Sequence, residues 1–381
     1  MTLRWSPLAA GLVWSLATAT PLCAQGDTTK HVLKPGWWLI PGTTTRMTIG
    51  GYVKADLIHD LKPIGSPNYF DVSKIPTDGS TGTSTHLQAM ETRIFLDVRR
   101  DSRFGEVRGF VEGDFFGSGN SFRLRHAIVQ VGERWLVGQY WSTFMDELII
   151  PATLDFEKPA AYAFARHAQF RYTHPLGDRL QLAVAVEEPS RNVDTPSPGT
   201  LSNPLPDLVA RLKHTGTRGH LLVAGFVGNV AFAPDSGAVQ QMTTSGVNLS
   251  GGLQVGEKDM LTAQVIYGPG IARYRFGTFG APDANAIIQP ITGLAATLGY
   301  QRHWSSEWTS FLVLNAGTDD PQAGQPGSDM DFATYGAVNL LWHFTPYAYA
   351  GVEYLHGLRR DINGDEGTAD RIMVSVRMNI N

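Results

Sequence analysis

The segment Arg371–Asn381 alternates strictly between apolar and other side chains. Its apolar positions are Ile372, Val374, Val376, Met378 and Ile380, and the positions between them are Arg371, Met373, Ser375, Arg377 and Asn379. A period of two places the apolar side chains on one face of a strand. The pattern recurs about sixteen times along the chain. The sequence therefore predicts an all-β fold, a 16-stranded antiparallel transmembrane β-barrel with an apolar outside and a polar inside.

The connections between these strands are expected to alternate between short and long. We predict strands near 47–59, 88–100, 106–116, 122–132, 134–142, 166–174, 179–188, 206–214, 219–228, 245–256, 259–268, 293–302, 307–316, 333–344, 347–357 and 370–380. Short gaps precede every second strand, and the long gaps are 60–87, 142–165, 189–205, 229–245, 269–292, 317–332 and 358–369, with 117–121 the one short member of that set. Short periplasmic turns and longer outside loops are typical of outer-membrane barrels.

The alternation also predicts which residues face lipid. Expected lipid-facing rows are Ile49, Val53, Ala55 and Leu57; Ile94, Leu96 and Val98; Val107, Val111 and Phe115; Leu180, Leu182, Val184 and Val186; and Leu261, Ala263, Val265 and Tyr267. Aromatic residues gather beside two short turns, at Trp304, Trp308, Trp342, Phe344 and Tyr347. Such rings mark the membrane interface, although ordinary edge aromatics are the alternative.

The start of the chain predicts secretion. A basic Arg4, an apolar run over 8–19 and a small residue at Ala24 indicate a signal peptide over 1–24. Residues 25–46 are then expected to form a short periplasmic segment and 47–381 the barrel. Charged residues are 17% of the chain, below the about 25% usual for soluble domains, and the net charge of −4 argues against nucleic acid.

The third outside loop, 142–165, is too apolar to lie exposed. Met145, Leu148, Ile149, Ile150 and Leu154 need a surface to pack against, and the inner wall of the barrel is the obvious one. An inward-folded third loop would narrow the pore and place acidic residues at the constriction, namely Asp146, Glu147 and Asp155. A loop packed on the rim or on a neighbouring subunit is the alternative.

Charged residues on the inward faces define the candidate pore lining. The basic candidates are Lys54, Arg93, Arg108, Arg123, Arg125, Arg166, Arg171, Arg211 and Arg377, and the acidic ones are Asp56, Glu91, Glu112 and Asp114. A basic wall facing an acidic loop would create a transverse field and favour anions. The alternative is that each arginine pairs with a wall acid and only stiffens the barrel.

No motif indicates catalysis or a cofactor. The glycine-rich stretch 112–120 lacks the Gly-Lys-Ser/Thr of a phosphate loop. The stretch 361–367 begins like a calcium loop, but no acid closes it. No serine or cysteine sits in a nucleophile elbow, and no histidines have metal-ligand spacing. The sequence predicts no enzyme, no cofactor and no metal site.

Several motifs in the first half of the chain resemble the DcaP-like outer-membrane porins. They are IPGT (40–43), GGYVKAD (50–56), FDVSKIPTDG (70–79), EGDFFG (112–117), LRHA (124–127), GQYWSTFMD (138–146) and TLDF (153–156). The resemblance is dense over 35–189 and thins to strand pattern afterwards. It implies a passive, homotrimeric porin of the outer membrane of Gram-negative bacteria, which takes up small anionic solutes such as dicarboxylates.

Pattern and resemblance together predict passive diffusion of small, hydrophilic, anionic solutes through a barrel surrounded by outer-membrane lipid and lipopolysaccharide. Three other functions stay open. A structural or adhesive barrel would have a closed lumen, a porin for neutral solutes would show stacked aromatics along the lumen, and an outer-membrane hydrolase would need a nucleophile and base near the outer rim. The sequence does not name the solute.

Overall fold

The computed structural model describes residues 35–159, 161–188, 192–275 and 277–380. Strands β1 to β9 are β1 (Trp38–Leu39), β2 (Arg46–Asp60), β3 (Ser84–Gln88), β4 (Arg93–Ser102), β5 (Gly105–Asp114), β6 (Arg123–Val131), β7 (Trp135–Trp141), β8 (Arg166–Pro175) and β9 (Leu180–Glu187). Strands β10 to β21 are β10 (Gly199–Ser202), β11 (Asp207–Thr215), β12 (Gly219–Pro234), β13 (Gln240–Val255), β14 (Asp259–Pro269), β15 (Gly280–Pro282), β16 (Ile288–Pro290), β17 (Thr292–His303), β18 (Trp308–Asp320), β19 (Met330–Thr345), β20 (Ala348–Asp361) and β21 (Glu366–Asn379). Four short 3-10 helices, η1 (Val72–Lys74), η2 (Ser118–Asn120), η3 (Glu147–Ile149) and η4 (Ile271–Arg273), lie between strands.

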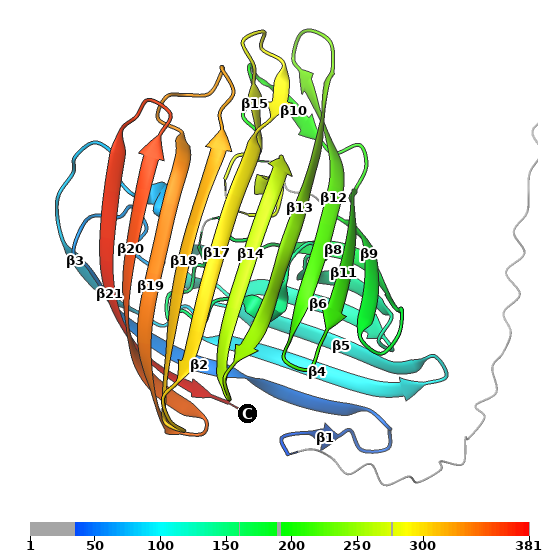
Figure 1. Cartoon of the computed structure of the whole chain (residues 1–381). Helices are drawn as coiled ribbons and strands as arrows, with labels where there is room; N and C mark the ends of the chain where they lie inside the picture. The colour runs from blue at the N-terminus through cyan, green and yellow to red at the C-terminus, as the bar shows by residue number, and fades with distance from the viewer. Residues whose placement is uncertain (1–34, 160, 189–191, 276, 381) are drawn as a thin grey trace, which may run out of the picture. The chain divides into compact units, whose positions relative to one another are not determined.

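The strands close into an antiparallel barrel. Neighbours along the chain pair with each other, and β2 pairs with β21, with Tyr52 opposite Asn379 and Asp60 opposite Arg371. β3 and β4 both pair with β2 and together occupy one strand position, while β1 and β10 are short additions. Sixteen strand positions therefore surround the interior (Figure 1). The predicted fold class and strand number are confirmed.

Each predicted strand matches one of these positions, but three outside hairpins are longer than predicted. β12 runs to Pro234 and β13 starts at Gln240, so the predicted loop 229–245 shrinks to 235–239. The predicted loops 317–332 and 358–369 shrink in the same way, to 321–329 and 362–365. Their sequences lose the lipid-facing alternation once the strands leave the membrane, whereas backbone pairing continues without it. The alternation therefore marks the membrane-embedded part of each strand.

The outer surface of the barrel is apolar and the inner surface is polar. Large apolar side chains at alternating positions are exposed, including Val53, Leu57, Val265 and Val374. Their inward neighbours are buried, as Lys54 and Ser375 show. The five aromatics expected at the membrane interface are all exposed at the ends of β17 to β20, where Trp308 and Trp342 stack. Among the described residues, no helix is long and apolar enough to cross a membrane.

Side chains of three long loops pack against inward positions of the strands. Phe70 and Ile75 of loop 61–83 join Tyr335, Leu355 and Met373 in one buried cluster. Loop 142–165 and loop 270–291 contribute to a second cluster with β11, β12 and β14, through Phe144, Ala163, Ile271 and Tyr274. The sequence pointed to 142–165 alone. The apolar residues of the other two loops, spaced among prolines, glycines and aspartates, were overlooked.

The predicted signal peptide and residues 25–34 lie outside the described residues. Of the segment before the barrel, Trp38 and Leu39 pair with Met47 and Arg46, so this part folds back along β2. The first barrel strand starts at Arg46, one residue before the expected position.

A charge on the outer face should destabilise the barrel. Leu298 lies mid-way along β17 with its side chain outward and 56% exposed. Leu298→Arg should cost about 2–4 kcal/mol of folding free energy, because the guanidinium would face hydrocarbon. Urea titration of the refolded protein in lipid vesicles measures this cost. Leu298→Ile is the matched control, and equal stability of the two variants would contradict the orientation of β17.

Candidate functional site

One end of loop 142–165 is held by a buried carboxylate of the wall. Glu187, at the end of β9, accepts hydrogen bonds from the Thr143 amide at 2.6 Å and from the Ser142 hydroxyl at 2.7 Å. Asn248 of β13 donates to the Phe144 carbonyl at 2.7 Å. Glu187 is fully buried, so its two oxygens act as fixed acceptors for the loop.

The middle of the loop is held by a second buried carboxylate. Glu353 of β20 accepts from the Leu154 amide at 2.7 Å and from the Asp155 amide at 2.8 Å. Asn339 of β19 donates both to Glu353 and to the Ala152 carbonyl, at 2.9 Å each. Further along the loop, the Ala163 amide donates to Gln264 of β14 at 2.8 Å. Neither Glu187 nor Glu353 was among the predicted site residues, because the strand pattern does not show which inward acid meets loop backbone.

Two of the three acids expected at the constriction are used in packing. Asp155 is fully buried, accepts hydrogen bonds from the amides of Phe70 and Glu157, and lies 3.4 Å from Arg371. Asp146 is 1% exposed, caps η3, and lies 2.8 Å from His220. The structure therefore does not place Asp155 or Asp146 on open space, because each carboxylate is enclosed by the groups it binds.

Loop 142–165 carries three more charged side chains, Glu147, Glu157 and Lys158. Glu147 is half-buried and makes no ion pair with any described residue. Burial raises the pKa of Glu157 to about 7, so this carboxyl changes charge near neutral pH. Lys158 donates to the Thr153 hydroxyl at 2.7 Å, and burial lowers its pKa. Glu157 and Lys158 lay outside the predicted site.

Many of the predicted wall arginines pair with acids of the wall. The pairs are Arg93 with Glu112, Arg108 with Asp97, Arg123 with Asp114, and Arg125 with both Glu112 and Asp114. Lys54 contacts Asp56 and Glu91 and is 1% exposed. Arg125 is 2% exposed, whereas the side chain of Arg123 is 37% exposed. Of this group, Arg123 therefore reaches open space and Lys54, Asp56, Asp114 and Arg125 do not.

Three arginines on the β6–β8 side gather around aromatic rings. The guanidinium carbons of Arg123 and Arg125 lie 5.3 and 5.5 Å from the centre of the Phe156 ring. Those of Arg125 and Arg166 lie 5.9 and 5.0 Å from the centre of Trp141. Stacking on ring faces stabilises a guanidinium without neutralising it. The wall beside the loop therefore keeps positive charge.

Four predicted arginines make no ion pair with a carboxylate among the residues that the structure describes: Arg166, Arg171, Arg211 and Arg377. Arg171 is buried and donates to Gln169 at 2.9 Å and to the Trp141 carbonyl. Arg377 lies over Tyr52, 3.6 Å from the ring centre. Arg211 points inward from β11, half-buried and without a hydrogen-bond partner among the described side chains. The strand pattern alone could not separate these free cations from the paired ones.

The stretch 361–367, which begins like a calcium loop, stabilises the β20–β21 hairpin. Asp361 accepts from Arg359 at 2.6 Å and from Thr77 at 2.8 Å, and Asn363 and Asp365 bond to each other in the β20–β21 turn. In the described part of the chain, no group of three or more candidate ligands could hold a metal ion.

A closed barrel of sixteen strands with an apolar outside and a charged interior is the architecture of outer-membrane porins. Residues 38–380 match the family model of the DcaP outer membrane protein. The chain therefore belongs to the DcaP family, and it is a channel-forming barrel of the outer membrane.

Solved structures share the fold. The outer membrane channel DcaP of Acinetobacter baumannii aligns with a TM-score of 0.80 at 23% identity, over 88% of this chain and 97% of that one. The anion-selective porin from Comamonas acidovorans aligns with a TM-score of 0.62 at 10% identity, over 88% and 100% of the two chains. The trimer form of OmpT of Vibrio cholerae aligns with a TM-score of 0.56 at 12% identity, over 88% and 99%. No curated protein matches the chain. Two of these neighbours are described as a channel and as a porin.

Glu353→Gln should loosen loop 142–165. The amide side chain keeps one acceptor oxygen, so one of the two loop amides loses its buried partner at a cost of about 1–3 kcal/mol. Hydrogen exchange of the Leu154 and Asp155 amides should therefore accelerate roughly tenfold or more, as followed by mass spectrometry. Glu366→Gln, at an exposed position of β21, is the control. Unchanged exchange in Glu353→Gln would show that this carboxylate does not hold the loop.

Proposed function

We propose that the protein is a passive diffusion channel for small hydrophilic solutes that favours anions, and that loop 142–165 narrows its lumen. The single observation that carries the charge preference is the set of inward arginines without an acidic partner, of which Arg211 is the freest. A cation that no carboxylate neutralises attracts anions entering a confined, low-dielectric passage.

The constriction is supported by where the loop is bound. Its backbone bonds reach β9 and β13 near one end and β19 and β20 in the middle, and Lys54 of β2 donates to the Leu154 carbonyl. These strands stand on different sides of a closed barrel, so a segment that contacts all of them has to cross the interior. We therefore expect the half-buried Glu147 to face the solute path in place of Asp146 and Asp155, and Glu157, which is 8% exposed, to act on it through its charge.

Two alternatives are tested by the same recordings. A porin for neutral solutes is supported by the rings of Trp141, Phe156 and Phe164, but guanidinium groups lie over all three of them. Those faces are therefore covered by cations rather than open to a sugar. A closed structural barrel would insert into a bilayer without conducting.

We also propose a homotrimer in contact with outer-membrane lipid and lipopolysaccharide. The support is the trimer form of OmpT, which shares the fold, and the apolar band around the outer wall. Single-channel recording in a planar bilayer under a salt gradient tests the proposal, with succinate added afterwards. Current steps in threes, an anion-selective reversal potential and succinate-dependent noise are expected, whereas insertion without current would overturn it.

Arg211→Gln should weaken the anion preference. A unit charge about 8 Å from a passing ion contributes about 0.5 kcal/mol in a water-like medium, favourable for an anion and unfavourable for a cation, so the anion-to-cation permeability ratio should fall roughly fivefold. The reversal potential under a salt gradient measures this ratio. Arg100→Gln, at an exposed position on β4, is the matched control. A ratio that stays at the wild-type value in Arg211→Gln would remove Arg211 from the pore wall.

The anion preference should also depend on pH. Glu157 has its pKa raised to about 7, so it is neutral below that pH and negative above it. Because the added negative charge lies next to Phe156 and its arginines, the permeability ratio should decline as the pH rises from 5 to 9, with a midpoint near 7. Glu157→Gln should flatten this step. A step of equal size in the variant would assign the titration to another group.

A further inference from the structure

A cavity of about 430 Å³ lies among the long loops at one rim of the barrel. Its lining comes from loops 61–83, 188–198, 270–291, 321–329 and 362–365 and from the strand ends beside them. The volume falls in the about 300–1,000 Å³ range of small-molecule sites. Neither the strands nor loop 142–165 explain why these five loops should enclose a space.

The walls of the cavity are tied together by hydrogen bonds. Arg359 donates to the Ser73 carbonyl at 2.6 Å and to the Ser328 carbonyl at 2.7 Å, which joins two of the loops. On the other side, Asn192 donates to the Gly277 carbonyl at 2.9 Å, and the Asp194 amide donates to the Gly280 carbonyl at the same distance. The cavity is therefore preformed, and a solute that enters it meets groups already fixed in place.

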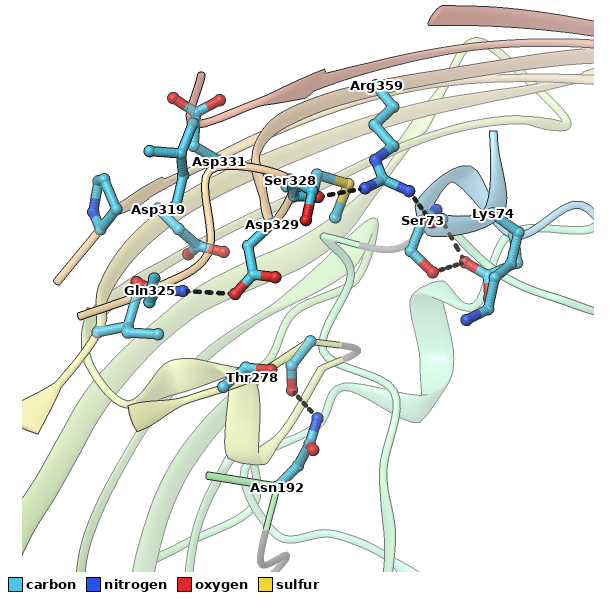
Figure 2. Close-up of a pocket in the computed structure, with 16 residues that line it drawn as sticks. Ser73, Lys74, Asn192, Thr278, Asp319, Gln325, Ser328, Asp329, Asp331 and Arg359 are labelled. Carbon is cyan, nitrogen blue, oxygen red and sulfur yellow. Dashed lines mark hydrogen bonds between the residues drawn. The ribbon is translucent and has the colours of Figure 1, made fainter. Parts of the chain in front are cut away.

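Most charges of the lining are neutralised by ion pairs. Asp319 pairs with Arg275, Asp331 with Arg360, and Arg359 with Asp361. Three charged groups of the lining make no ion pair among the described residues, Asp71, Lys74 and Asp329, and Asp71 already accepts hydrogen bonds from the Ser73 amide and hydroxyl. Figure 2 shows the Asp329 carboxylate and the Lys74 ammonium directed into the cavity from opposite sides.

Each of these two groups lacks a counter-charge. Asp329 accepts a hydrogen bond only from Gln325, at 3.3 Å, among the side chains drawn in Figure 2. Burial, and after it the charge of Asp329, raise the pKa of Asp194. Lys74 is exposed on the opposite wall and makes no ion pair with a described residue.

We infer that the cavity is an entry site for small zwitterionic solutes, whose carboxylate pairs with Lys74 and whose ammonium pairs with Asp329. A simple anion is attracted by Lys74 but repelled by Asp329, and a simple cation meets the reverse, so neither gains from both walls. A solute that carries both charges at the right separation gains from each. The inference rests on the proposed channel function, because it names a class of solute that the channel collects at its mouth.

The test uses the full refolded chain in a non-ionic detergent micelle and saturation-transfer NMR. The probes are β-alanine, 4-aminobutyrate and 6-aminohexanoate, with butyrate and butylammonium as their single-charge counterparts. At least one zwitterion should bind about two- to fivefold more tightly than either counterpart, the range expected for one exposed ion pair, with an optimum of chain length. Equal affinity of all five probes would overturn the inference.

Two variants and a control make the test specific. Asp329→Asn should remove the advantage of the zwitterion over butyrate, and Lys74→Met its advantage over butylammonium. Asp235→Asn removes an exposed acid that does not line the cavity and should change neither. If the advantage survives in both cavity variants, the site is not formed by these groups. The reversal potential of the wild-type channel is recorded in parallel. This separates a failure of the proposed anion selectivity from a failure of the cavity to prefer zwitterions.

Discussion

The pairing of β2 with β21 is the interaction on which the rest of the structure depends. In hydrocarbon a strand edge would leave its backbone amides and carbonyls without partners, at several kcal/mol each. The bonds that run from Tyr52–Asn379 to Asp60–Arg371 remove that edge. Closure then divides the strand side chains into two sets. The outward, apolar set contacts lipid, and the inward, polar set can bond only to one another, to the loops and to water.

Because the interior is enclosed, its polar groups can hold backbone from the loops. Glu187 and Glu353 each accept two hydrogen bonds from loop 142–165, and Arg371 bonds to Asp60, Asp155 and the Ser66 carbonyl. Such buried charges would be costly alone, but here each is matched by several partners. The wall and the loops thus stabilise each other.

The strand number and facing could be predicted because a period of two is a local property that every strand repeats. Ile372 and Val374 show it without any knowledge of their neighbours. The site could be predicted only in outline, since whether an arginine is free depends on partners distant in sequence. Arg125 and Arg211 look alike in their strands, yet Asp114 forms an ion pair with the first and no described carboxylate forms one with the second. Asp155, which the sequence placed at the constriction, depends on distant partners in the same way, because Phe70 and Arg371 enclose it.

The apolar packing of loops 61–83 and 270–291 covers much of the inner face of β11–β14 and β17–β21, whereas the half-exposed Arg93, Arg108 and Arg123 stand on β4–β6. The inner wall is therefore uneven, because apolar loop packing gathers on one set of strands and half-exposed, ion-paired arginines on another. A substitution in a packed loop and a substitution at one of these arginines thus disturb separate parts of the interior.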